Sequence, residues 1–175
     1  MEKIDSILMQ QGFSDYKWIK PEEIVVAQWV RMKCSYGCDG YGSGTCPPNT
    51  PSVEECEKFF KEYKKGIIIR LRKFADKNSY PSDWSTEITN KLLDIERNIF
   101  LMGFPKVFLL NQTCCSRCKI CSNNRMECKD KMKARPSTEG FAVDVYQTAK
   151  NAGLEIEVIT NNCAEMNKIA ILLIE

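Results

Sequence analysis

Three segments of the chain carry apolar residues at helical spacing and are predicted to be helices. The first follows Ser52, a residue type favoured as a helix N-cap. It is predicted to end before Gly66. Its apolar stripe comprises Val53, Cys56, Phe60 and Tyr63. The second spans residues 83–102, with a stripe formed by Ile88, Leu92, Ile95, Ile99 and Met102. The third is predicted to start at Ser137, interpreted as its N-cap, and to end at Gly153.

Shorter segments rich in β-branched and aliphatic residues are predicted to be strands. These segments are residues 24–33, 67–74, 106–110, 154–160 and 168–174. The order of the elements indicates one domain over residues 1–175, of α/β or α+β class. We expect a mixed sheet of about five strands, three helices and two cysteine-rich loops. Both loops follow a predicted strand, and such positions commonly carry functional residues.

Composition narrows the functional classes. The chain has 175 residues and is 43% hydrophobic, which is enough for a real core without disulfide or metal staples. Its net charge of +2 comes with no basic run, so nucleic-acid binding is not expected. No apolar run is long enough to span a membrane and no signal peptide is evident, so we expect a cytoplasmic protein. Disulfides are rare there, and its ten cysteines, in the absence of histidine, point to metal or redox chemistry.

The strongest signal is a group of cysteines that we call the downstream motif: Cys115, Cys118, Cys121 and Cys128. The first three have C-x2-C-x2-C spacing, which lets successive thiolates converge while backbone N–H groups turn toward sulfur. This spacing is typical of ligands to a [4Fe–4S] cluster. Zinc is the alternative, although structural zinc sites usually take two separated C-x2-C pairs or include histidine. Cys114 is adjacent, and two neighbouring residues rarely point into one site, so we interpret it as a spare thiol. The alternative left open is a register in which Cys114 replaces Cys115 as a ligand.

A second group, the upstream motif, comprises Cys34, Cys38 and Cys46. It lies in a glycine-rich segment whose backbone can approach a bound group closely, and we predict a second metal site there. Its fourth ligand is left open at this point. The candidates are Cys163, Cys56 and Asp39, although Cys56 lies on an apolar helix face and is better interpreted as a core residue. Without a fourth protein ligand, one iron would be open to water or substrate.

The two motifs resemble those of a prokaryotic family of unknown function described as predicted metal-binding proteins. The similarity rests on "CDGYGSGTCPPNTP" and on "CSRCKICSNNRMEC" followed by "ARPSTEGFAVDVYQTAKNAG". The resemblance implies that Cys38, Cys46 and the four cysteines of the downstream motif correspond to the family's cysteines, with Cys34 slightly upstream of them and not itself a motif position. It also marks Tyr41, Gly42, Pro47, Pro48, Arg135, Pro136, Ser137 and Glu139. Ala142 stands in place of a glycine of that pattern, which affects the helix break expected there but not the ligands. Arg135 is expected to donate to cluster sulfides or to a carboxylate, or to be a surface cation.

The sequence therefore predicts a metal-binding protein with one [4Fe–4S] cluster, and with a second metal centre at the upstream motif. The expected role is electron transfer or redox support together with a redox partner protein. Two alternatives stay open. One is a zinc-stabilised interaction module. The other is an enzyme whose open iron at the upstream motif binds a small substrate.

Overall fold

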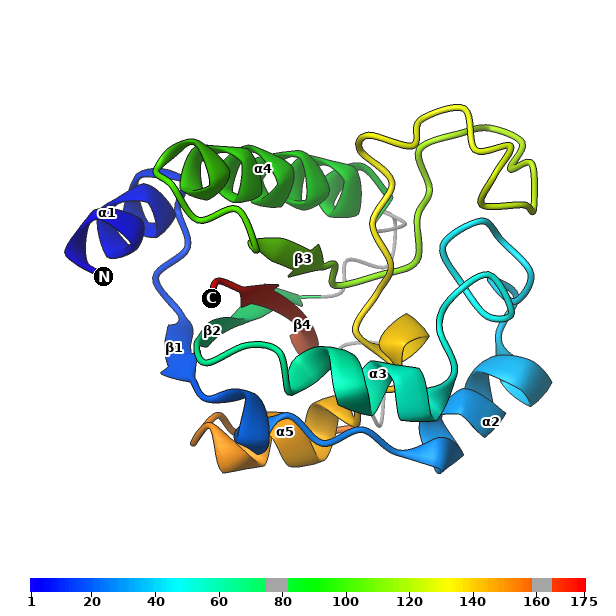
Figure 1. The fold of residues 1–175 in the computed structure, drawn as a ribbon, viewed down its shortest axis with the longest axis horizontal. Helices are drawn as coiled ribbons and strands as arrows, with labels where there is room; N and C mark the ends of the chain where they lie inside the picture. Colours follow the sequence, from blue (N-terminus) through cyan, green and yellow to red (C-terminus); the bar gives the residue numbers. More distant parts are fainter. Residues whose placement is uncertain (75–81, 159–164) are drawn as a thin grey trace.

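A central sheet with helices on both faces organises the chain (Figure 1). The computed structural model describes residues 1–74, 82–158 and 165–175. Within these residues there are five α-helices and one four-stranded sheet, so the domain is α+β. The helices are α1 (Glu2–Gln10), α2 (Gln28–Gly37), α3 (Val53–Phe60), α4 (Ser82–Leu101) and α5 (Val145–Asn151). None of these described helices is long and apolar enough to cross a membrane.

The sheet has the strand order β1-β2-β4-β3, and each pair of neighbours is antiparallel. Its strands are β1 (Tyr16–Ile19), β2 (Gly66–Phe74), β3 (Phe108–Leu110) and β4 (Glu165–Leu173). The two central strands, β2 and β4, pair along all nine of their residues. Their near-continuous apolar runs are typical of strands buried on both faces.

Alternate residues of the central strands serve two separate cores, because successive side chains of a strand point to opposite faces. Ile67 and Ile69 pack with residues of α1 and α4 on one face. Ile68 packs with residues of α3 and α5 on the other face. Figure 1 shows the same arrangement, with α1 and α4 above the sheet and α3 and α5 below it.

The two helices with the clearest apolar stripes are confirmed. In α4, the stripe residues Leu92, Ile95 and Ile99 are fully buried. In α3, the Ser52 hydroxyl accepts the N–H of Glu55 at 3.2 Å, and the Glu55 carboxylate accepts the N–H of Ser52 at 2.7 Å. This reciprocal capping box satisfies two N–H groups at the helix start. The helix ends at Phe60, earlier than predicted, and the turn residues 61–65 lead from it to β2.

The strand predicted at residues 24–33 is wrong. Only a single bridge forms there, between Val26 and Val143, and α2 begins two residues later. The N–H of Asp144 donates to the Val25 carbonyl at 2.8 Å, and that of Ala27 donates to the Ala142 carbonyl at 2.9 Å. The extended residues before α2 therefore form hydrogen bonds with the 142–144 turn, and they add no strand to the sheet.

Three further predictions need correction. The expected mixed sheet of about five strands is a four-stranded antiparallel sheet, and α1 and β1 were not predicted. The helix expected from Ser137 to Gly153 is a short 3-10 turn, η2 (Glu139–Phe141), and then α5. The two are separated because Ala142 is left-handed, with φ of 57°. Of the strand predicted at 154–160, residues 154–158 form no strand, and residues 159–160 lie outside the described part.

We expect Leu92→Ala to lower the free energy of unfolding by about 2–5 kcal/mol, because it leaves a cavity in a packed core. Leu92 is 0% exposed. Urea unfolding followed by circular dichroism measures the change. The matched control is Leu101→Ala in the same helix, where the side chain is 69% exposed and a change within about 0.5 kcal/mol is expected. Equal costs for the two variants would contradict the assignment of the α4 core face.

Candidate metal centre

The loop that carries the downstream motif is closed at its base. It leaves β3 at Asn111, whose N–H donates to the Pro136 carbonyl at 2.8 Å, and the N–H of Thr138 donates back to the Asn111 carbonyl at 3.1 Å. At the same end, the Arg135 guanidinium forms an ion pair with the Glu96 carboxylate at 2.8 Å. The Glu96 side chain is buried and also accepts the N–H of Leu109 at 2.9 Å. Of the expected partners of Arg135, the carboxylate is therefore the one observed.

The four thiols of the downstream motif line one small cavity of about 30 Å³. Two backbone N–H groups, those of Gly44 and Asn123, donate to the Cys121 sulfur at 3.5 Å each. These donors lower the pKa of the Cys121 thiol, whereas burial raises the pKa of Cys115. Cys121 is the exposed member of the group. The sequence-predicted ligand set is thus brought together, with N–H groups directed at one of its sulfurs.

A hydroxyl group also lines the downstream cavity. Thr45, from the upstream segment, is 5% exposed, and its Oγ1 has no hydrogen-bond partner among the described residues. Arg117 forms an ion pair with Asp130 at 2.5 Å. This pair joins the part of the loop next to Cys118 to the part that follows Cys128. The buried Thr45 hydroxyl can donate a hydrogen bond to a thiolate or to a group bound in the cavity. Sequence reasoning missed it because Thr45 is 70 or more residues from the downstream motif in the chain.

The upstream motif is held partly by a helix and partly by turns. Cys34 lies on α2 one turn after Val30, and both residues line a cavity of about 640 Å³. Cys38 is the C-cap of this helix, and Cys46 follows in a turned segment. Arg31 anchors the helix, since its guanidinium donates to the Pro51 carbonyl at 2.8 Å and to the Gly140 carbonyl at 3.3 Å. The first cysteine-rich segment therefore starts from a helix and does not follow a strand.

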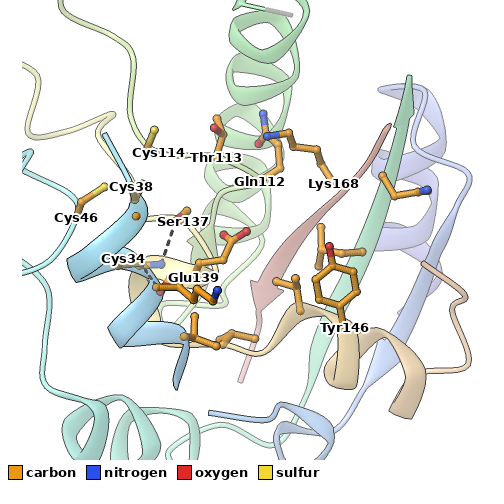
Figure 2. A pocket seen from close by; sticks show the side chains of 18 of the residues that line it. Cys34, Cys38, Cys46, Gln112, Thr113, Cys114, Ser137, Glu139, Tyr146 and Lys168 are labelled. Carbon is orange, nitrogen blue, oxygen red and sulfur yellow. Dashed lines mark hydrogen bonds between the residues drawn. The ribbon is translucent and has the colours of Figure 1, made fainter. Parts of the chain in front are cut away.

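Cys114 joins the upstream motif. Figure 2 shows its thiol on the same side of the large cavity as the three upstream cysteines, and all four line that cavity. The interaction between the side chains of Cys46 and Cys114 lowers the pKa of Cys114 and raises that of Cys46. Burial, followed by the nearby Cys38, raises the pKa of Cys34. The interpretation of Cys114 as a spare thiol did not anticipate this neighbourhood.

The other candidates for a fourth upstream ligand lie elsewhere. Cys56 is 0% exposed within the core beneath α3, as expected, and burial raises its pKa to about 11. Asp39 is exposed and is not among the residues that line the large cavity. Cys163 falls outside the described residues. Within the described part of the chain, Cys114 is thus the thiol that accompanies the upstream motif.

The two cysteine-rich segments pack against each other. The Asn49 side-chain amide donates to the carbonyls of Gly42, Ser43 and Asn123, at 3.1, 3.2 and 3.2 Å. The bond from the Gly44 N–H to Cys121 adds a second link between the segments. Across the described residues, however, no three side chains that could act as ligands are arranged to hold one metal ion. The thiols therefore share two cavities without forming a closed coordination shell.

The large cavity extends beyond the four thiols. Gln112, which is 2% exposed, and Lys168 lie along it (Figure 2). The Gln112 amide nitrogen donates to the Ser85 carbonyl at 3.1 Å, which fixes the orientation of the amide. Its Oε1 has no partner among the described residues. This cavity thus combines thiols, a positive charge and a buried acceptor, and its volume is in the range of small-molecule sites.

The fold and the two groups of thiols define a cysteine-rich α+β protein of the metal-binding class. The chain belongs to the family described as "Predicted metal-binding protein (DUF2284)", whose model matches residues 17–174. This confirms the resemblance seen in the two motifs, and it supports a metal bound by the cysteines. Searches among curated proteins and among solved structures found no match.

Arg135→Ala is expected to lower the free energy of unfolding by about 3–5 kcal/mol, because it leaves the buried Glu96 carboxylate without its cation. Urea unfolding of the protein as purified measures this. Arg97→Ala, at an exposed position of the same helix as Glu96, serves as the control and should change stability by about 0.5 kcal/mol or less. If the two variants are equally stable, the ion pair does not hold the base of the loop.

Proposed function

We propose that the downstream motif binds one [4Fe–4S] cluster and that the protein transfers single electrons. The observation that carries this proposal is the joint placement of Cys115, Cys118, Cys121 and Cys128 around one cavity. Their spacing is the ferredoxin-type run of three cysteines followed by a fourth. A donor set made only of thiolates suits soft metals and iron–sulfur clusters.

Hydrogen bonds to sulfur give further support. The N–H groups of Gly44 and Asn123 donate to Cys121, and such bonds are among the factors that set the reduction potential of a cluster. The unpartnered hydroxyl of Thr45 in the same cavity is a further donor. When bound, the cluster supplies reversible one-electron reduction. The four cysteines of the downstream motif would hold it, and the N–H groups of Gly44 and Asn123 would point at one of its ligands, Cys121.

The surface around this site suits a redox partner protein. Residues 111–135 contain seven basic and two acidic side chains. Three apolar side chains of the same loop are also exposed, namely Ile120, Met126 and Met132. We therefore propose a partner with an acidic surface, because opposite charges steer association. A cluster held by Cys115, Cys118, Cys121 and Cys128 would accept one electron from a reduced partner and give it up to an oxidised acceptor.

A zinc-stabilised module is the second candidate, and the size of the downstream cavity favours it. At about 30 Å³ this cavity is far smaller than the upstream cavity of about 640 Å³, so a single ion needs less displacement of the loop than a cluster does. A cluster would require the loop around the exposed Cys121 to move outward. In this alternative the ion would join the two cysteine-rich segments into a rigid surface for a partner.

The metal and acid-labile sulfide of anaerobically purified protein distinguish the two candidates. We expect iron and sulfide in equal amounts, at least about four of each per chain, because each [4Fe–4S] cluster carries four. Cys115→Ala should lose about four of each, whereas the control Cys56→Ala, which changes a core cysteine, should lose none. Zinc without sulfide in iron-replete preparations would overturn the cluster and with it the electron-transfer role.

A further inference from the structure

We infer that Cys114 and the upstream motif form a second metal centre with four thiolate ligands. Only the kind of group bound, an iron–sulfur cluster, rests on the proposed function. The ligand set itself is different from that of the downstream motif. Cys114 and the three cysteines of the upstream motif together supply four thiolates. Four is the usual number of ligands for thiolate-bound zinc and for a [4Fe–4S] cluster.

The first argument is that three separate parts of the chain bring thiols to one place. α2 supplies Cys34, the turn after it supplies Cys38 and Cys46, and the segment after β3 supplies Cys114. The Cys34 thiol is directed at the Glu139 carbonyl, at 3.8 Å. The four thiols thus line one cavity from two segments that are distant in the chain. A bound metal would draw their sulfurs together, since no three described side chains are arranged to hold one as they stand.

Two of these thiols lie close to the same glycine. A Cβ atom at Gly40 would lie 3.5 Å from the Cys38 sulfur and 3.5 Å from the Cys114 sulfur, which is ordinary van der Waals contact. The two sulfurs therefore both lie next to one backbone position. The adjoining cavity of about 640 Å³ has ample room for a cluster beside the thiols, in contrast to the small downstream cavity.

The second argument comes from the neighbouring cysteine. Cys115 lines the downstream cavity and Cys114 lines the upstream one. Two consecutive residues therefore line two different cavities. This agrees with the rule that neighbouring residues rarely point into one site. With Cys114 as the fourth ligand of the upstream motif, no coordination position of that centre would be left open for a substrate. A ligand in the large cavity would therefore lie beside a centre with four protein ligands.

Metal content of the full-length protein and its variants, purified without oxygen, tests the inference. The wild type should contain about eight iron and eight sulfide per chain, as expected for two [4Fe–4S] clusters. Cys114→Ser and Cys38→Ser should each retain about half of both. The double variant should lose no more than either single variant, because both residues belong to one centre. Cys56→Ser is the control and should retain all of the metal.

Several outcomes would overturn the inference. One is wild-type metal content in Cys114→Ser, which would make Cys114 a spare thiol. Another is complete loss of metal in Cys114→Ser while Cys38→Ser retains half. Cys114 would then be needed for the fold or for both centres, and not as a ligand of one of them. A third is a disulfide between Cys46 and Cys114, found by mass spectrometry of the anaerobic protein.

The proposed function can fail separately. About two zinc per chain in the wild type and about one in both Cys114→Ser and Cys38→Ser would overturn the iron–sulfur proposal but support the second four-thiolate centre. Since Cys38 is exposed, its replacement by serine disturbs no core packing, and this variant keeps the test informative if Cys114→Ser folds poorly.

Discussion

The buried carboxylate of Glu96 is the point on which the arrangement of the cysteine-rich part depends. A buried charge is costly unless it is paired and hydrogen-bonded, and Glu96 has both the Arg135 guanidinium and the N–H of Leu109 as partners. These bonds join α4, strand β3 and the exit of the downstream loop at one place. With Asn111 hydrogen-bonded to Pro136, both ends of the loop are held next to the sheet. The loop can then carry irregular, metal-ligating residues without losing its position.

This fixed base also determines how the two cysteine-rich segments meet. Asn49 links the upstream turns to Asn123 of the downstream loop, and the Gly44 N–H reaches the Cys121 sulfur. Each cavity is therefore lined partly by the other segment, and neither site is complete by itself. Because Cys114 and Cys115 are consecutive, their Cα atoms are only about 3.8 Å apart. Two centres that share this peptide bond would be close enough to affect each other's charge and protonation.

The two cavities are suited to different tasks. The downstream cavity is small and next to an exposed cysteine in a basic loop with exposed apolar side chains, which suits contact with a partner protein. The upstream cavity is large, and Gln112 and Lys168 lie along it, which suits a small ligand beside a metal centre. In the proposed function, electrons enter or leave at the downstream side. The upstream side is where a small molecule could be bound.

Local patterns in the sequence correctly predicted the elements that rest on local physics. The stripe of α4, the capping box of Ser52 and the central strands follow from periodicity and from side-chain hydrogen bonds close in the chain. The failures have a common cause. Residues 24–26 have β-branched side chains, but their backbone partners are the distant residues 142–144. A helix expected across Ala142 is interrupted there by a left-handed residue, which periodicity does not reveal.

The chemistry of the cysteines shows the same division. The spacing of the downstream motif is a local property, and it identified the four thiols that share the smaller cavity. The sequence did not reveal the neighbours of Cys114, because Cys46 and Cys38 are 68 and 76 residues away from it and are brought to it by α2 and by the closed loop base. The sequence by itself thus determined the kind of candidate ligand and which four thiols share the smaller cavity. Only the tertiary structure decided which further thiol lines the larger cavity, because that depends on contacts between segments that are far apart in the chain.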